Sequence, residues 1–190
     1  MPSIEIKHKN KIGFETKCVL TATKAGTRKF GPYEEVFDED GHLIFKGRRM
    51  IDPGEIVEVI ETDNIICDEG LLLGAGFFRD ESAVYDVGLT YCEIGTDNTA
   101  PAAGDVILGA FSHRNIITNN SRAAYADTFA TFFSAAECTI AIEEAGIWGG
   151  SNAAAGEATG LLFAHWLASF DNTGGLYDVT ITYILTIARG

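Results

Sequence analysis

Apolar and polar residues alternate along most of the chain, and the alternation is clearest near its C-terminal end. In residues 176–188 nearly every second side chain is apolar, and threonine or aspartate occupies most positions between. Side chains of a β-strand point alternately to two faces, so this period of two predicts a strand with one buried face. Similar patterns predict strands over residues 4–8, 12–23, 56–60, 84–94, 106–111, 113–118, 123–133, 137–148 and 160–170.

Turn signals and one apolar run complete the pattern. Asp40-Gly41 lies between two short apolar runs and predicts a tight hairpin turn, because this dipeptide accepts positive φ at both central positions. An apolar run over about residues 69–78, with acidic residues near its start, predicts a buried helix. Residues 149–160 lack bulky side chains, so we expect this loop to be mobile or to be ordered only by a neighbour.

Many strands and a single helical stretch predict a mainly β protein. We expect an antiparallel β-sandwich, of jelly-roll or immunoglobulin-like type, with an N-terminal β-rich segment and one short helix. The expected division is an attachment or packing segment in residues 1–60, a helical connector in residues 61–83 and the sandwich in residues 84–190.

Charge and hydropathy exclude several classes of protein. The 190 residues carry a net charge of −13, all of it in residues 61–190, and such an acidic surface repels the phosphates of a nucleic acid. No run of about 18 apolar residues is present, so we expect no membrane span. Charges near the N-terminus argue against a secretion signal and favour assembly in a cytoplasm. Residues 1–30 are locally basic and form either an arm for an acidic partner surface or a solvated pair of strands.

The cysteine, histidine and acidic residues that often form catalytic or metal sites have structural explanations in this sequence. Four cysteines without metal-ligand spacing are expected to be reduced core thiols, and we expect no metal and no cofactor. Oxygen-bearing side chains in residues 95–105 could hold calcium, but an Asx-type turn explains them as well. His165 stands in an apolar strand, which favours a hydrogen-bonded histidine in the core or at an interface over a general base.

Paired carboxylates at positions 143 and 144 suggest acid–base work on a glycosidic bond. Adjacent strand residues point to opposite faces, so Glu143 and Glu144 cannot flank one substrate. We therefore expect one of the two to be solvated and the other to form a partly buried, charge-assisted pair with Arg114. Glu144 is the predicted partner.

Several short motifs follow one another in the C-terminal two thirds of the chain. They are Asn64-Ile-Ile with Gly70-Leu71, Gly95-Thr96 with a Thr/Ala/Pro loop, Arg114, Glu144-Ala-Gly146-Ile-Trp148 and a final alternating strand. In this order they resemble a widespread family of tailed-bacteriophage virion proteins, over about residues 60–188. The chain departs from the family's E-x-x-R motif, because Phe111 stands where the acid would precede Arg114. The resemblance identifies Glu144 and Arg114 as parts of two family motifs.

The resemblance implies a non-enzymatic structural component of a virion, either a minor tail, collar or fibre-base protein or a capsid decoration protein. Its expected partners are other virion proteins and copies of itself, assembled in the cytoplasm of a host bacterium. Strand 160–170 is apolar on both faces, which favours homo-oligomerisation with Trp148, Trp166 and Phe170 at the interface. The alternative is a module that binds a carbohydrate or receptor on the host surface, and an exposed Trp148 or Trp166 would favour it.

Overall fold

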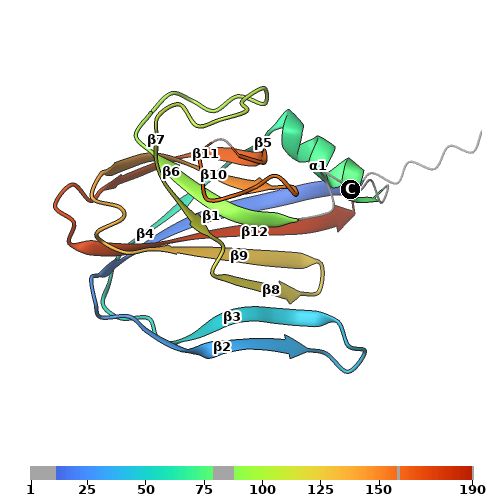
Figure 1. Cartoon of the computed structure of the whole chain (residues 1–190), viewed down its shortest axis with the longest axis horizontal. Coiled ribbons are helices and arrows are strands. Elements are labelled where there is room, and N and C mark those ends of the chain that lie inside the picture. Colours follow the sequence, from blue (N-terminus) through green and yellow to red (C-terminus); the bar gives the residue numbers. More distant parts are fainter. Residues whose placement is uncertain (1–11, 79–87, 158, 190) are drawn as a thin grey trace, which may run out of the picture.

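The protein folds into two antiparallel sheets packed face to face (Figure 1). The structure is a computed structural model that describes residues 12–78, 88–157 and 159–189. The strand predicted over residues 4–8 lies outside the described residues. The larger sheet has seven strands, in the order β2 (Lys29–Phe37), β3 (Leu43–Asp52), β8 (Asn119–Ala123), β9 (Ala126–Phe133), β12 (Tyr177–Arg189), β1 (Ile12–Lys24) and β4 (Ile56–Thr62). The smaller sheet has five, in the order β5 (Ile65–Ile66), β11 (Leu161–Asp171), β10 (Ala141–Gly149), β6 (Leu89–Gly95) and β7 (Phe111–Ile116). This arrangement confirms the predicted β-sandwich.

The first and last described strands pair along their whole lengths in the larger sheet. The β1–β12 ladder runs from Ile12 opposite Arg189 to Lys24 opposite Tyr177, and β4 pairs with the other edge of β1. Strands β1 and β4 are therefore integral to the sandwich. The division expected at residue 60 does not follow the sheets, because β1 lies between β12 and β4 in the larger sheet.

The core between the sheets is built by the inward side chains of both. Trp166 of the smaller sheet stacks on Tyr183 of the larger one, with ring centroids 5.8 Å apart. Phe163 meets the same tyrosine edge to face at 6.1 Å. Aromatic pairs of this kind add to the stabilisation that comes from apolar burial. All four cysteines, Cys18, Cys67, Cys92 and Cys138, are buried and free, which confirms the prediction of core thiols.

Two of the predicted strands are wrong in detail. Residues 106–110 belong to a loop, and their apolar character reflects burial of Leu108 under that loop instead of strand pairing. The strand predicted over residues 123–133 is a hairpin of β8 and β9 that turns at Ala124 and Tyr125. Ala124 adopts a φ of 53°, and no glycine or proline marks this turn in the sequence.

Helix α1 (Asp68–Phe78) confirms the predicted helix and packs on β11. Gly70 makes the close approach possible, because a Cβ atom there would lie 2.1 Å from the backbone oxygen of Phe163. Leu71 and Leu72 are exposed, so the helix is buried on one side only. The second apolar face of β11, which suggested a subunit interface, is thus covered within the chain.

Strands β2 and β3 form the predicted hairpin at the edge of the larger sheet, away from the smaller sheet (Figure 1). Its turn is closed by the amide of Asp38, which donates to the carbonyl of His42 at 2.9 Å, and Gly41 has a φ of 84°. The hairpin joins β8 by only two paired positions. No helix in the described part of the chain is long and apolar enough to cross a membrane.

Candidate functional site

A row of charged and polar residues crosses the smaller sheet on its outer face, the face turned away from the larger sheet. Arg114 of β7 lies opposite Glu93 of β6, Glu93 lies opposite Gly146 of β10, and Gly146 lies opposite His165 of β11. Residues directly opposite one another in a ladder share a face, so the four positions form one line. Arg114, Glu93 and His165 are all buried. We call this line, together with Glu144 two positions before Gly146, the buried charged row.

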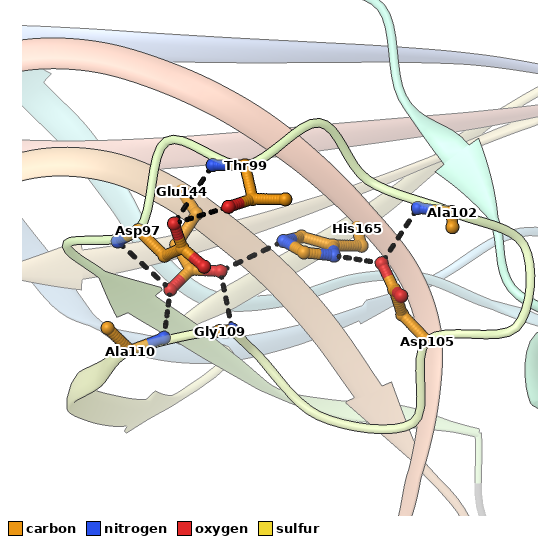
Figure 2. Close-up of polar contacts among 8 residues, drawn as sticks. All are labelled: Asp97, Thr99, Ala102, Asp105, Gly109, Ala110, Glu144 and His165. Atoms are coloured by element: carbon orange, nitrogen blue, oxygen red, sulfur yellow. Dashed lines mark hydrogen bonds and ion pairs between the residues drawn. The ribbon is translucent and has the colours of Figure 1, made fainter.

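His165 is held between two carboxylates (Figure 2). Its Nδ1 lies 2.8 Å from Oδ2 of Asp105, and its Nε2 lies 3.0 Å from Oε2 of Glu144. A histidine ring can donate to both neighbours only when each nitrogen carries a hydrogen, which is the imidazolium form. The ring is fully engaged by these two contacts and has no nitrogen left for a substrate.

Glu144 connects this histidine to the loop over residues 96–110. Its Oε2 accepts a hydrogen bond from the amide of Gly109 at 2.9 Å, and its Oε1 accepts one from Ala110 at 2.6 Å. The amide of Asp97 donates to Oε1 at 3.3 Å (Figure 2). Three backbone N–H groups aimed at one buried carboxylate stabilise its negative charge. Both ends of the loop are thereby fixed to β10.

The middle of the same loop carries two further aspartate contacts. Asp97 accepts hydrogen bonds from the amide and hydroxyl of Thr99 at 2.9 and 2.8 Å, which confirms an Asx-type turn and lowers the pKa of Asp97. Asp105 accepts one from the amide of Ala102 at 2.8 Å. Oδ1 of Asp97, the hydroxyl of Thr99 and Oδ2 of Asp105, which were considered for calcium, are therefore used by the loop itself. Among the described residues, no group of three or more His, Cys, Asp or Glu side chains is placed to hold a metal ion.

Arg114 forms the second part of the buried charged row. Its Nη1 lies 2.9 Å from Oε1 of Glu93, and both side chains are 1% exposed or less. The same guanidinium donates to the carbonyl oxygens of Gly156 and Thr159 at 2.9 and 2.7 Å, and it lies over the rings of Tyr91 and Trp148. Burial lowers the pKa of Arg114, and the charge of Glu93 opposes that shift. The loop over residues 149–160 was expected to be mobile or to be ordered only by a neighbour, but Arg114 of its own chain binds it at Gly156 and Thr159.

The structure corrects the predicted ion pair between Arg114 and Glu144. Arg114 pairs with Glu93, and Glu144 pairs with His165. Both charges are buried, but they lie on β7 and β10 with β6 between them, so each has a nearer partner. Glu93 was missed, although an acid on the same strand face as Tyr91 is a signal that sequence reading can use.

The predicted interface residues are also placed differently. Trp148, Trp166 and Phe170 are 0%, 2% and 5% exposed within a single chain. Trp166 and Phe170 belong to the core between the sheets, and Trp148 packs with Cys67 and Leu162 on the outer face. None of the three is available to a partner or to a sugar.

The chemistry that this arrangement can perform is limited. His165 and two carboxylates suggest an acid–base group, but each ring nitrogen of His165 is bound to a carboxylate oxygen. A general base needs a free nitrogen within reach of the proton it removes. The buried charged row is best explained as the device that fixes two long loops onto the sheet.

The structure defines the class of the fold, a β-sandwich with two loops fixed by internal charges, but it does not identify a protein family. No protein-family model matches the chain, and neither a curated protein nor a solved structure matches it. The resemblance to tailed-phage virion proteins consequently rests on its sequence motifs alone.

Proposed function

We propose that the chain is a non-enzymatic structural component of a tailed-phage virion, and that it acts through contacts with copies of itself and with other virion proteins. The location would be a minor tail, collar or fibre-base position or a decoration site on the capsid. Many modest contacts repeated over a symmetric particle give strong attachment without one tight interface.

The observation that carries this proposal is the number of exposed apolar side chains at the two edges of the larger sheet, on the β2–β3 hairpin and on β4. Of the seventeen large apolar side chains that are exposed in the described part of the chain, eight lie on these three strands. Five of the eight lie on the β2–β3 hairpin and three on β4 at the opposite edge, and exposed apolar side chains that gather in this way commonly mark an interaction site. The eight are Tyr33, Phe37, Leu43, Met50, Ile51, Ile56, Val57 and Val59.

The buried charged row supports the same proposal. Its ionisable groups contact one another and the backbone of two loops, and they stabilise surface shape. A decoration or tail protein needs fixed loops on a rigid framework, since both determine which neighbours fit. This is how the geometry of the row favours a structural role over catalysis.

The proposal is tested on particles. Virions purified through a density gradient from a host that carries the encoding genome are expected to contain the chain in a fixed ratio to the major capsid or tail protein. Quantitative mass spectrometry measures the ratio, and immunogold labelling gives the location. A chain that is abundant in the lysate but absent from the purified particles would contradict the proposal.

A matched pair of substitutions tests whether the exposed apolar side chains of β2 to β4 attach the chain to the particle. Ile51→Ser, at a side chain that is 70% exposed, is expected to lower incorporation into particles. Tyr125→Ser removes a side chain that is 75% exposed but lies outside β2 to β4, and it should leave incorporation unchanged. Equal urea midpoints for both variants would show that stability is not the cause.

The alternative, a module that binds a host-surface carbohydrate or receptor, has one observation in its favour. A hollow of about 360 Å³ lies between the hairpin and the ends of β6 and β7, and Tyr33, Lys46, Thr90, Ile116 and Asn120 are part of its lining. An exposed tyrosine beside polar groups suits a sugar ring. Binding on a glycan array that Tyr33→Ala abolishes would favour this alternative. Burial of Trp148 and Trp166 weighs against it.

A further inference from the structure

Strand β4 lies at one edge of the larger sheet, and among the described residues only β1 pairs with it. Ile56, Val57 and Val59 are 50%, 49% and 52% exposed, so β4 carries apolar side chains without a cover in the described chain. Alternate N–H and C=O groups of an outermost strand point away from the sheet and can pair with another strand. Such an edge is a template for strand addition.

The charges on this edge select the kind of strand that fits. Glu55, Glu58 and Glu61 lie on or beside β4, which has no basic residue of its own. Lys24 pairs with Glu55 and Lys17 pairs with Glu61, while Glu58 forms no ion pair within the described chain. Acidic side chains repel a second β4 edge, because like charges opposite each other destabilise a strand pair. The matching strand must be apolar on one face and basic.

The N-terminal residues of the chain have this pattern. Ile4 and Ile6 alternate with Glu5 and Lys7, and Lys9 and Lys11 follow. The alternation predicts a strand over residues 4–8, and the three lysines complement the glutamates of β4. Residues 1–11 have no described place in the sandwich.

We propose that residues 4–9 of one copy add as an antiparallel strand to the β4 edge of a second copy, with Lys7 opposite Glu58 and Ile6 opposite Val59. The proposal deepens the proposed function, because it rests on self-assembly of the chain. It supplies the interface that the buried Trp148, Trp166 and Phe170 cannot.

Chain geometry favours a second copy over the same molecule. β4 runs antiparallel to β1, so a strand added antiparallel to β4 runs in the direction of β1. Within one molecule, Lys9 would then end near Thr23 and the chain would have to return to Ile12, about 30 Å along β1. Two intervening residues span only about 10 Å. An antiparallel arm must therefore come from a neighbour.

The test uses full-length chains. Wild type, Glu58→Lys, Lys7→Glu and the double variant are compared by sedimentation over a concentration series, with Glu39→Lys, an exposed glutamate of the β2–β3 turn, as the matched control. Each charge reversal is expected to raise the dissociation constant of the oligomer by about tenfold. The double variant should recover most of the affinity, and the control should behave as wild type.

A second measurement identifies which copy supplies the arm. Nitrogen-15-labelled and unlabelled chains are mixed and treated with a zero-length carbodiimide, which joins lysines to nearby carboxylates. Mass spectrometry is expected to find Lys7 or Lys9 joined to Glu58 in peptide pairs of mixed label. Links found only between peptides of one label would overturn the proposal, because the arm would then lie on its own molecule.

The remaining outcomes separate this proposal from the proposed function. If the charge reversals leave the dissociation constant of the oligomer unchanged, the proposed strand addition is wrong, but a structural role in the virion is still possible. A wild-type chain that stays monomeric at all concentrations also overturns the arm. Absence of the chain from purified particles counts against the proposed function, whatever the sedimentation result.

Discussion

His165 depends on both of its carboxylate neighbours, and so does the loop over residues 96–110. The ring contacts Asp105 in the middle of that loop, and Glu144 binds the amides near its two ends. Loss of the ring leaves Oε2 of the buried Glu144 without its hydrogen-bond partner on His165. The carboxylate would then keep the amides but lose a charge-assisted partner.

His165→Leu is therefore expected to lower the free energy of unfolding by on the order of 3 kcal/mol. Hydrogen exchange at the amides of Gly109 and Ala110 should accelerate more than exchange in β12. His113→Gln is the matched control, because His113 is partly exposed and lies 3.7 Å from Glu137, and it should cost less than about 1 kcal/mol. Equal effects of the two substitutions would contradict the role assigned to His165.

Arg114 gives a second prediction at this scale. Arg114→Met removes the cation from a fully buried pair and leaves Glu93 without it, which we expect to cost about 3–5 kcal/mol. Adding Glu93→Leu should recover a large part of that loss, since replacing both members of a buried pair by apolar residues is often nearly neutral. Urea unfolding measures both. Loop 149–160 should become sensitive to protease in either variant, because its carbonyl contacts to Arg114 are lost.

Sequence reading reached some residues of the site and missed their pairing. It correctly predicted a hydrogen-bonded histidine at position 165 and buried roles for both Arg114 and Glu144. The partners depend on which strands are neighbours and on their register, and alternation is compatible with several registers. The pairing of β10 with β11 is also irregular between Ile142 and Glu144, and the sequence contains no sign of that bulge.

At the scale of elements, helix α1 offers a matched pair of glycines. A Cβ at Gly70 would meet the backbone of Phe163 at 2.1 Å, whereas a Cβ at Gly74 would meet nothing within 4 Å. Gly70→Ala is expected to destabilise the protein by at least about 2 kcal/mol, because the helix must move away from β11. Gly74→Ala should stabilise it by up to about 1 kcal/mol through helix propensity. Thermal unfolding of both variants checks the pair, and the same sign for both would contradict the docking described here.

Elements were more predictable than contacts. The hairpin at Asp40-Gly41, the helix and β12 were found because each carries a strong local signal. The turn at Ala124 was not found, because none of the usual turn residues occupies it. The loop over residues 96–110 was partly read as strand, because its buried leucine gives the same apolar signal as strand pairing.

At the scale of the whole molecule, the four buried thiols make the free energy of unfolding decrease at alkaline pH. Burial raises the pKa of Cys138 to about 11 and that of Cys67 to about 12, and it also raises the pKa values of Cys18 and Cys92. An unfolded thiol loses its proton near pH 8.5, well before these folded ones. Stability from this source is complete below about pH 8.5 and falls as the pH rises toward the folded pKa values.

The expected loss is about 1.4 kcal/mol per pH unit for each thiol above pH 8.5. Urea unfolding at pH 7.5 and pH 9.5, with a reductant present, measures it. Cys138→Ala should reduce the loss of stability per pH unit by the contribution of one thiol. A stability that does not change over this range would show that the thiols are accessible to solvent in the folded protein.

The β1–β12 ladder has a consequence for biosynthesis. A ribosome releases β1 before β12, so one edge of β1 waits for its partner until the chain has emerged as far as the end of β12 at Arg189. The β2–β3 and β8–β9 hairpins involve near neighbours and can close early, but pairings between distant segments form slowly. A prematurely terminated product would retain an open gap in the middle of its larger sheet. Such truncated chains should be cleared by proteases or should aggregate instead of surviving as a smaller domain.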